Sequence, residues 1–130
     1  MNFFELKGHE IVDITVEDYD LVRIKTLHEG KPRHFSLFHN QDCCENVRLI
    51  REEGDLTSLK GQLITEAEED ISDNNPEWYG GDYIDDSHTW SKYRLKTDKD
   101  EVTLWFLGES NGYYGETMDF EELNHFDHDL

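Results

Sequence analysis

The sequence contains few basic residues and no long apolar segment. Lys and Arg number 12 against 31 Asp and Glu, so the formal net charge of the 130-residue chain is −19. Binding of DNA or RNA requires basic side chains against the phosphates, and an anionic membrane surface would repel this chain. No segment approaches the roughly 18 apolar residues of a membrane span. We therefore expect neither nucleic acid nor membrane as a direct partner.

The cysteine content and the N-terminus argue against secretion. The only two cysteines, Cys43 and Cys44, are adjacent and do not form the disulfide framework of a small secreted domain. The first seven residues lack the basic region and apolar run of a signal peptide. Three Trp, six Tyr and seven Phe supply enough large apolar surface for one core without crosslinks. These features predict a single cytoplasmic domain over residues 1–130.

Alternation of apolar and polar residues predicts antiparallel strands. We expect a three-stranded meander at 11–17, 20–27 and 33–39, and a hairpin at 89–96 and 101–107. Residues 54–61 fit a short helix with Asp55 as its N-cap and Gly61 as its terminator. The pattern leaves 44–51 and 63–71 open between strand and helix, makes 73–86 a loop, and allows a short helix in the tail at 119–130. The predicted class is α+β, mainly one antiparallel sheet with one or two short helices.

Acidic residues concentrate in the segment 66–86, which contains no Lys or Arg. Its nine carboxylates are those of Glu66, Glu68, Glu69, Asp70, Asp73, Glu77, Asp82, Asp85 and Asp86. Residues 109–130 form a second base-free segment. Such surfaces keep a protein dispersed without any partner. Alternatively, they imitate a phosphate backbone and complement a basic channel on another protein. Charge repulsion of this size lowers the stability of the fold, which favours a functional reason for the acidic residues. The nine residues are therefore our candidate partner-binding surface.

The stretch 39–45 concentrates the residues that could carry chemistry. His39, Cys43 and Cys44 lie at the end of a predicted strand, and zinc favours histidine nitrogen and cysteine sulfur. His88 is the preferred fourth ligand because it begins a predicted strand that could neighbour this one. His28, His34 and Asp42 are weaker candidates. The spacing matches no established zinc motif, and two buried inert thiols beside a surface histidine explain it equally well. Any zinc would be structural, tying a loop to the sheet.

Several stretches together resemble a family of small acidic proteins from phages and prophages of Gram-positive bacteria. They are HNQDCCENV at 39–47, GDLTSLKG at 54–61, the run 66–69, Thr89-Trp90 with Tyr93, and GESNGYY at 108–114 with Asp119-Phe120. The resemblance implies no named enzyme activity. Because small acidic phage proteins include anti-CRISPR proteins, it implies an inhibitor of an RNA-guided nuclease, which holds its guide and target in a positively charged channel.

The sequence thus predicts a non-enzymatic inhibitor that binds a basic nucleic-acid-handling host protein, such as a type II CRISPR nuclease, and blocks nucleic-acid loading. One alternative is a metal- or thiol-dependent hydrolase of a nucleotide signal, using His39, Cys43 and Cys44. Another is a small-molecule sponge with a stacking pocket at Trp78, Tyr79, Trp90 and Tyr113. The negative charge argues against an anionic nucleotide in such a pocket.

Overall fold

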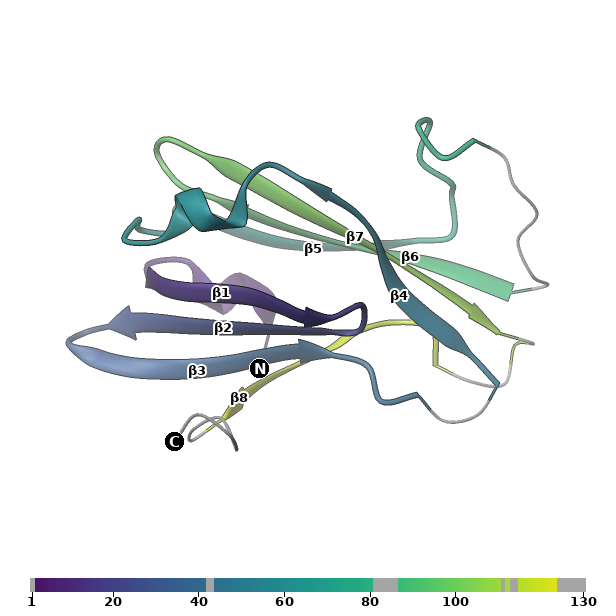
Figure 1. Cartoon of the computed structure of the whole chain (residues 1–130), viewed down its shortest axis with the longest axis horizontal. Helices are drawn as coiled ribbons and strands as arrows, with labels where there is room; N and C mark the ends of the chain where they lie inside the picture. The colour runs from purple at the N-terminus through teal and green to yellow at the C-terminus, as the bar shows by residue number, and fades with distance from the viewer. Residues whose placement is uncertain (1, 42–43, 81–86, 111, 113–114, 124–130) are drawn as a thin grey trace.

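The computed structural model describes residues 2–41, 44–80, 87–110, 112 and 115–123. Within these residues the chain forms two four-stranded antiparallel sheets packed face to face (Figure 1). The first sheet has the order β1-β2-β3-β8, and the second has the order β4-β7-β6-β5. The strands are β1 (Glu10–Asp18), β2 (Leu21–His28), β3 (Lys31–Phe38), β4 (Asn46–Glu53), β5 (Glu66–Ser72), β6 (Ser87–Lys96), β7 (Glu101–Ser110) and β8 (Asp119–Leu123).

The prediction of an α+β fold with one sheet is wrong. The only helical elements in the described part of the chain are two 3-10 helices, η1 (Phe3–Leu6) and η2 (Leu56–Leu59). The open segments 44–51 and 63–71 contribute β4 and β5, and the tail begins with β8. Edge strands hide their alternation because most of their side chains are exposed: in β5 only Ala67 is buried. No helix among the described residues has the length and apolar character needed to cross a membrane.

The predicted meander and hairpin are confirmed. β1, β2 and β3 pair in sequence order, and β6 pairs with β7 along its whole length. The turn between β2 and β3 places Glu29 and Gly30 at φ of 54° and 78°. Two successive residues with positive φ suit the twist of a tight hairpin. At η2 the Asp55 side chain accepts a hydrogen bond from the Thr57 amide, as expected for its N-cap.

One apolar core lies between the two sheets, and the 3-10 helices close its sides. Its largest members include Phe35 of the first sheet and Tyr93 and Phe106 of the second. On one side, the Phe3 ring of η1 packs edge-on against Tyr93 and Phe120, with centroids 5.0 and 5.3 Å away. On the other side, η2 contributes Leu56 and Leu59 to the core. The two buried polar clusters described next lie at one end of this sandwich.

Candidate functional site

His39 and Glu45 form a buried pair between the end of β3 and the start of β4. Nε2 of His39 lies 3.1 Å from Oε2 of Glu45, and Nδ1 lies 2.9 Å from the backbone oxygen of Thr117. The side chains are 7% and 0% exposed. Because a carbonyl oxygen only accepts, Nδ1 is the nitrogen placed to donate to Thr117, and Nε2 faces the Glu45 carboxylate. Both imidazole nitrogens are therefore engaged within the fold.

The described residues do not assemble the predicted zinc site. Cys43 lies outside the described residues, and Cys44 is disulfide-bonded, so its sulfur is not a free thiolate. His88 belongs to β6, which lies in the sheet opposite β3, so the expected neighbourhood of these strands is wrong. No group of three or more His, Cys, Asp or Glu side chains in the described part could hold a metal. Zinc therefore stays a prediction, and no step below depends on it.

The weaker ligand candidates lie elsewhere. His28 is at the opposite end of the first sheet, where its ring stacks on His9 with centroids 4.1 Å apart. His34 lies within β3. Asp42 is outside the described residues. Sequence spacing could not show which of these histidines lie near His39, because it does not determine at which end of the sheet each residue is placed.

Glu116 is the centre of a second buried polar cluster, which the sequence analysis did not identify. Its carboxylate accepts hydrogen bonds from Ser110 and from Thr89, the latter at 2.9 Å, and also from Ser87. Burial alone would raise the pKa of Glu116, but these three hydroxyl donors, together with the nearby His88, outweigh it and hold the pKa below its usual value. The only sequence indication was that Glu116 follows closely on the GESNGYY stretch.

The two clusters are joined, because Thr117 bonds to His39 and Glu116 bonds to Ser110. They collect residues from the HNQDCCENV, Thr89-Trp90 and GESNGYY stretches at one end of the sandwich. Ser110 beside a carboxylate has the composition of a nucleophile and its base. However, Ser110 is only 4% exposed and Glu116 only 9%, so a substrate has no access to the pair. The described residues of this polar end therefore fasten the strand ends together.

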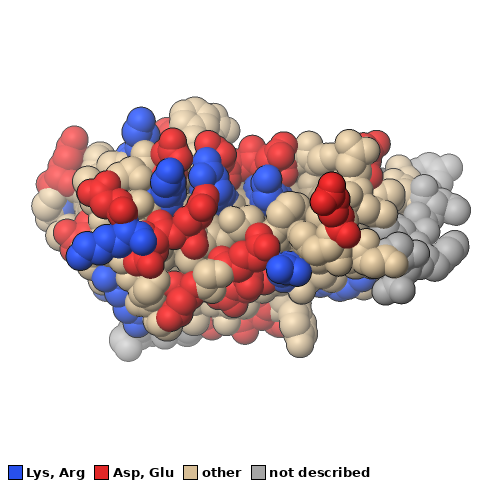
Figure 2. Space-filling view, turned by 90° about the horizontal axis from the view of Figure 1, so that it is seen from above, with Lys and Arg blue, Asp and Glu red and all other residues tan. Residues whose placement is uncertain are grey.

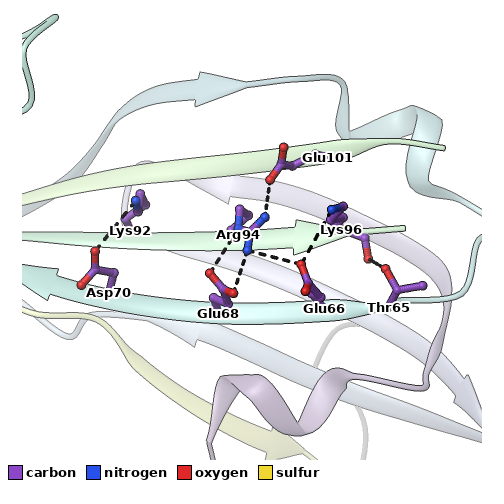
Figure 3. A network of polar contacts seen from close by, with 8 residues as sticks. All are labelled: Thr65, Glu66, Glu68, Asp70, Lys92, Arg94, Lys96 and Glu101. Carbon is purple, nitrogen blue, oxygen red and sulfur yellow. Dashed lines mark hydrogen bonds and ion pairs between the residues drawn. The ribbon is translucent and has the colours of Figure 1, made fainter. Parts of the chain in front are cut away.

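Part of the acidic segment is neutralised by the neighbouring strand. The β5–β6 register places Glu66 opposite Lys96, Glu68 opposite Arg94 and Asp70 opposite Lys92, and each pair is within 4.0 Å (Figure 3). Arg94 also reaches Glu101 at 2.5 Å. Its hydrogen bond to Glu68 lowers the pKa of that carboxyl. Figure 2 shows the same mixture, with Lys and Arg lying among the carboxylates of the face seen from above.

Arg94 should contribute more to stability than its neighbour Lys92. Arg94 contacts three carboxylates, whereas the one described carboxylate within ion-pair distance of Lys92 is that of Asp70, at 3.8 Å; Lys92 also lies 5.1 Å from the centroid of the Trp105 ring. We expect Arg94→Gln to lower the free energy of unfolding by about 1 kcal/mol at low salt and Lys92→Gln by a few tenths, since exposed pairs are weak and networks are stronger. Urea denaturation at low and high salt measures both. Equal losses, or losses insensitive to salt, would contradict a network role for Arg94.

The other members of the candidate surface differ in their surroundings. Glu69 accepts a 2.7 Å hydrogen bond from the Tyr93 hydroxyl, and burial together with this bond raises the pKa of Tyr93. Asp73 and Glu77 are exposed, and no described Lys or Arg lies within ion-pair distance of them. Asp82, Asp85 and Asp86 are outside the described residues. Glu69, Asp73 and Glu77 are thus the members that keep an unneutralised charge in the described structure.

Three of the four rings proposed for a stacking pocket do cluster on the outer face of the second sheet. Trp78 packs edge-on against Trp90 and Trp105, with centroids 5.6 and 5.3 Å away, and Tyr79 packs against Trp90 at 5.0 Å. Trp90 is only 1% exposed. Tyr113 lies outside the described residues. The rings hold the chain before residue 81 against the sheet and leave beside them a hollow of about 180 Å³.

A family model for a domain of unknown function, DUF7448, matches residues 5–120. The match covers both sheets and the polar end of the sandwich. No curated protein and no solved structure matches the chain. The comparisons therefore place the chain in a family without describing what its members do.

Proposed function

We propose that this chain, which belongs to the DUF7448 family of domains of unknown function, is a non-enzymatic binding protein whose acidic surface receives a basic protein. One observation carries the proposal: carboxylates outnumber bases 31 to 12. Most of the bases are already held in ion pairs, so they cannot neutralise the rest. A surplus of this size creates a field that attracts cationic surfaces and accelerates their encounter.

Many carboxylates stay unneutralised after the ion pairs are formed. The described ones that are at least partly exposed and have no described Lys or Arg within ion-pair distance are Glu5, Glu10, Asp18, Asp20, Glu29, Glu52, Asp55, Glu69, Asp73, Glu77, Asp98, Asp100, Asp119 and Glu121. They occur on both sheets and in several turns. Unneutralised negative charge is therefore spread over the described part of the molecule, whereas the sequence suggested one or two negative surfaces built from the two base-free segments.

The partner class that fits this field best is a protein that handles nucleic acid. Such proteins carry basic channels, and an RNA-guided nuclease holds its heteroduplex in one. A rigid anionic domain can occupy such a channel and compete with the guide or the target. The resemblance to small acidic phage proteins supports the same assignment. We therefore propose an inhibitor of an RNA-guided nuclease that acts by blocking nucleic-acid loading.

The two alternatives have weaker support. For the hydrolase, His39 and Glu116 are buried and fully engaged with their own partners, and Cys44 is disulfide-bonded. For the small-molecule sponge, the rings of Trp78 and Trp90 are used in packing against each other. Among the described members of these two clusters, no open group suits the chemistry that its hypothesis requires.

Calorimetric titration against a guide-free type II nuclease tests the proposal. We expect one-to-one binding that weakens about tenfold or more between low and moderately high salt, because screening shortens the range of charge attraction. Addition of guide RNA should displace the protein. Absence of binding, or affinity that does not change with salt, would refute the proposed function.

A charge-neutralised variant makes the test specific. E69Q/D73N/E77Q removes three unneutralised carboxylates and should weaken binding about three- to tenfold. The matched control is E69D/D73E/E77D, which alters side-chain length at the same positions and keeps every charge. We expect the control to bind like the wild type. Equal weakening by both variants would mean that shape, and not charge, governs the contact.

A further inference from the structure

A groove of about 620 Å³ runs between the β1–β2 turn and β4, the outer strand of the second sheet. Its described lining is Asp18, Tyr19, Asp20, Gln41, Glu45, Asn46, Val47, Arg48, Leu49 and Ile50. Four of these residues, 41 and 45–47, belong to the HNQDCCENV stretch. Gln41 donates hydrogen bonds to the backbone oxygen of Val47 and to the Asp20 carboxylate, at 2.9 and 3.2 Å. The stretch thus forms one wall of the groove, and the turn forms the other.

Main-chain hydrogen bonds hold the turn in place. The backbone oxygen of Tyr19 accepts from the amide of Leu49 at 2.7 Å, and that of Asp20 accepts from the amide of His39 at 3.1 Å. The Asp18 carboxylate accepts from the amide of Tyr19 at 2.8 Å. All three residues of the turn are therefore tied to the chain around them.

Tyr19 exposes its ring although its backbone is fixed. The residue is 71% exposed, the highest fraction among the described exposed large apolar residues. An exposed aromatic side chain is a common anchor in protein interfaces, and a fixed backbone reduces the entropy lost when it binds. Since the bonds of its main chain hold the turn, the ring is not needed for the fold. It is available for a partner.

The charges around the groove favour a positively charged ligand group. Asp18 and Asp20 flank Tyr19, and neither has a described Lys or Arg within ion-pair distance. Arg48 is the one base among the described lining residues, and it is paired with Glu109 at 2.8 Å. Leu49 and Ile50 add apolar surface. The groove therefore combines two carboxylates, an aromatic face and an apolar strip.

We propose that this groove receives an arginine-bearing segment of the basic partner, an assignment that rests on the proposed function and names its contact site. A guanidinium stacks on an aromatic face and at the same time donates paired hydrogen bonds to a carboxylate. Tyr19 supplies the face, and Asp18 or Asp20 supplies the carboxylate. The aliphatic part of the arginine side chain covers Leu49 and Ile50. A lysine offers neither the planar stack nor the paired bonds.

Titration with a hexa-arginine peptide and with the guide-free nuclease tests this assignment. Amide chemical shifts should move at residues 18–20 and 48–50 when the peptide is added. Tyr19→Ser and D18N/D20N should each weaken the binding of both probes about tenfold, because each removes one half of the guanidinium site. An asparagine at 18 still accepts the Tyr19 amide, so the turn should survive, and unchanged melting temperatures will confirm it.

Two matched controls distinguish binding in the groove from general charge attraction and from nonspecific binding to an exposed ring. Phe4→Ser removes another exposed ring, from η1, and E29Q/D98N removes two carboxylates from other turns. Both should change affinity less than about threefold. If the wild type binds the probes and the groove variants match these controls, the groove assignment is overturned and the proposed function stands. If the wild type binds neither probe, both fall. Equal affinity for hexa-lysine would overturn the choice of arginine.

Discussion

Gly108→Ala is expected to destabilise the protein by about 3 kcal/mol or more, as clashes with a fixed backbone do. A Cβ at Gly108 would overlap the backbone oxygen of Glu116 and lie 2.6 Å from its carbonyl carbon. The Glu116 segment cannot withdraw without breaking its hydrogen bonds to Ser110 and Thr89. Urea denaturation measures the loss, and the backbone shifts of residues 115–118 report any displacement.

Gly115→Ala is the matched control for this prediction. Gly115 is next to Glu116, has no positive φ, and an added Cβ there would meet no atom within 4 Å. We expect its free energy of unfolding to change by no more than about 0.5 kcal/mol. Similar stability of the two variants would show that β7 and the residue 116 segment do not approach as closely as described.

The second large effect is a loss of stability in acid that depends on His9. This ring is buried, its Nδ1 lies 2.8 Å from the Thr26 hydroxyl, and it stacks on His28. Burial, followed by the nearby charges of His28 and Arg33, lowers the pKa of His9 from 6.5 to about 4; Glu122 and Glu29 oppose this shift. The unfolded chain therefore takes up the proton first as the pH falls.

The direction of the pH dependence of stability follows from the difference between the pKa of His9 in the folded and in the unfolded chain. The contribution of His9 is complete above about pH 6.5 and decreases as the pH falls toward 4, by a total of about 3 kcal/mol. Carboxylates also titrate in this range, so the informative quantity is the difference between the wild type and His9→Gln. We expect the stability of the variant to lack this decrease. An imidazole titration followed by NMR reads the pKa directly, and a value near 6.5 for His9 would disprove the account.

The sequence and the structure agree where local pattern decides the outcome. Within the meander, β2 alternates clearly between buried and more exposed residues because one of its faces is buried, and the capping of η2 by Asp55 depends on neighbours along the chain. β5 and β8 lack that alternation because most of their side chains are exposed. The division of the strands into two sheets, and with it the wrong fold class, depends on contacts between distant segments.

The candidate sites show the same division. The HNQDCCENV, Thr89-Trp90 and GESNGYY stretches do contribute to one end of the sandwich. Glu116, which joins them, lies in no distinguishing sequence pattern. The base-free segment at 66–86 is base-free only along the chain, since Lys92, Arg94 and Lys96 come to lie beside it. Similarly, the position of Tyr19 at a groove depends on the bond between the turn and β4.

Composition accounts for the charge surplus and for the expectation that nucleic acid is not a direct ligand, because counts of acids and bases do not change on folding. Periodicity accounts for the strands with a buried face, because side-chain alternation is a property of each strand alone. Which carboxylates keep their charge and which histidine nitrogens stay open depend on register and on the packing of the two sheets. Those arise from contacts between residues far apart in the chain, and only the folded structure contains them.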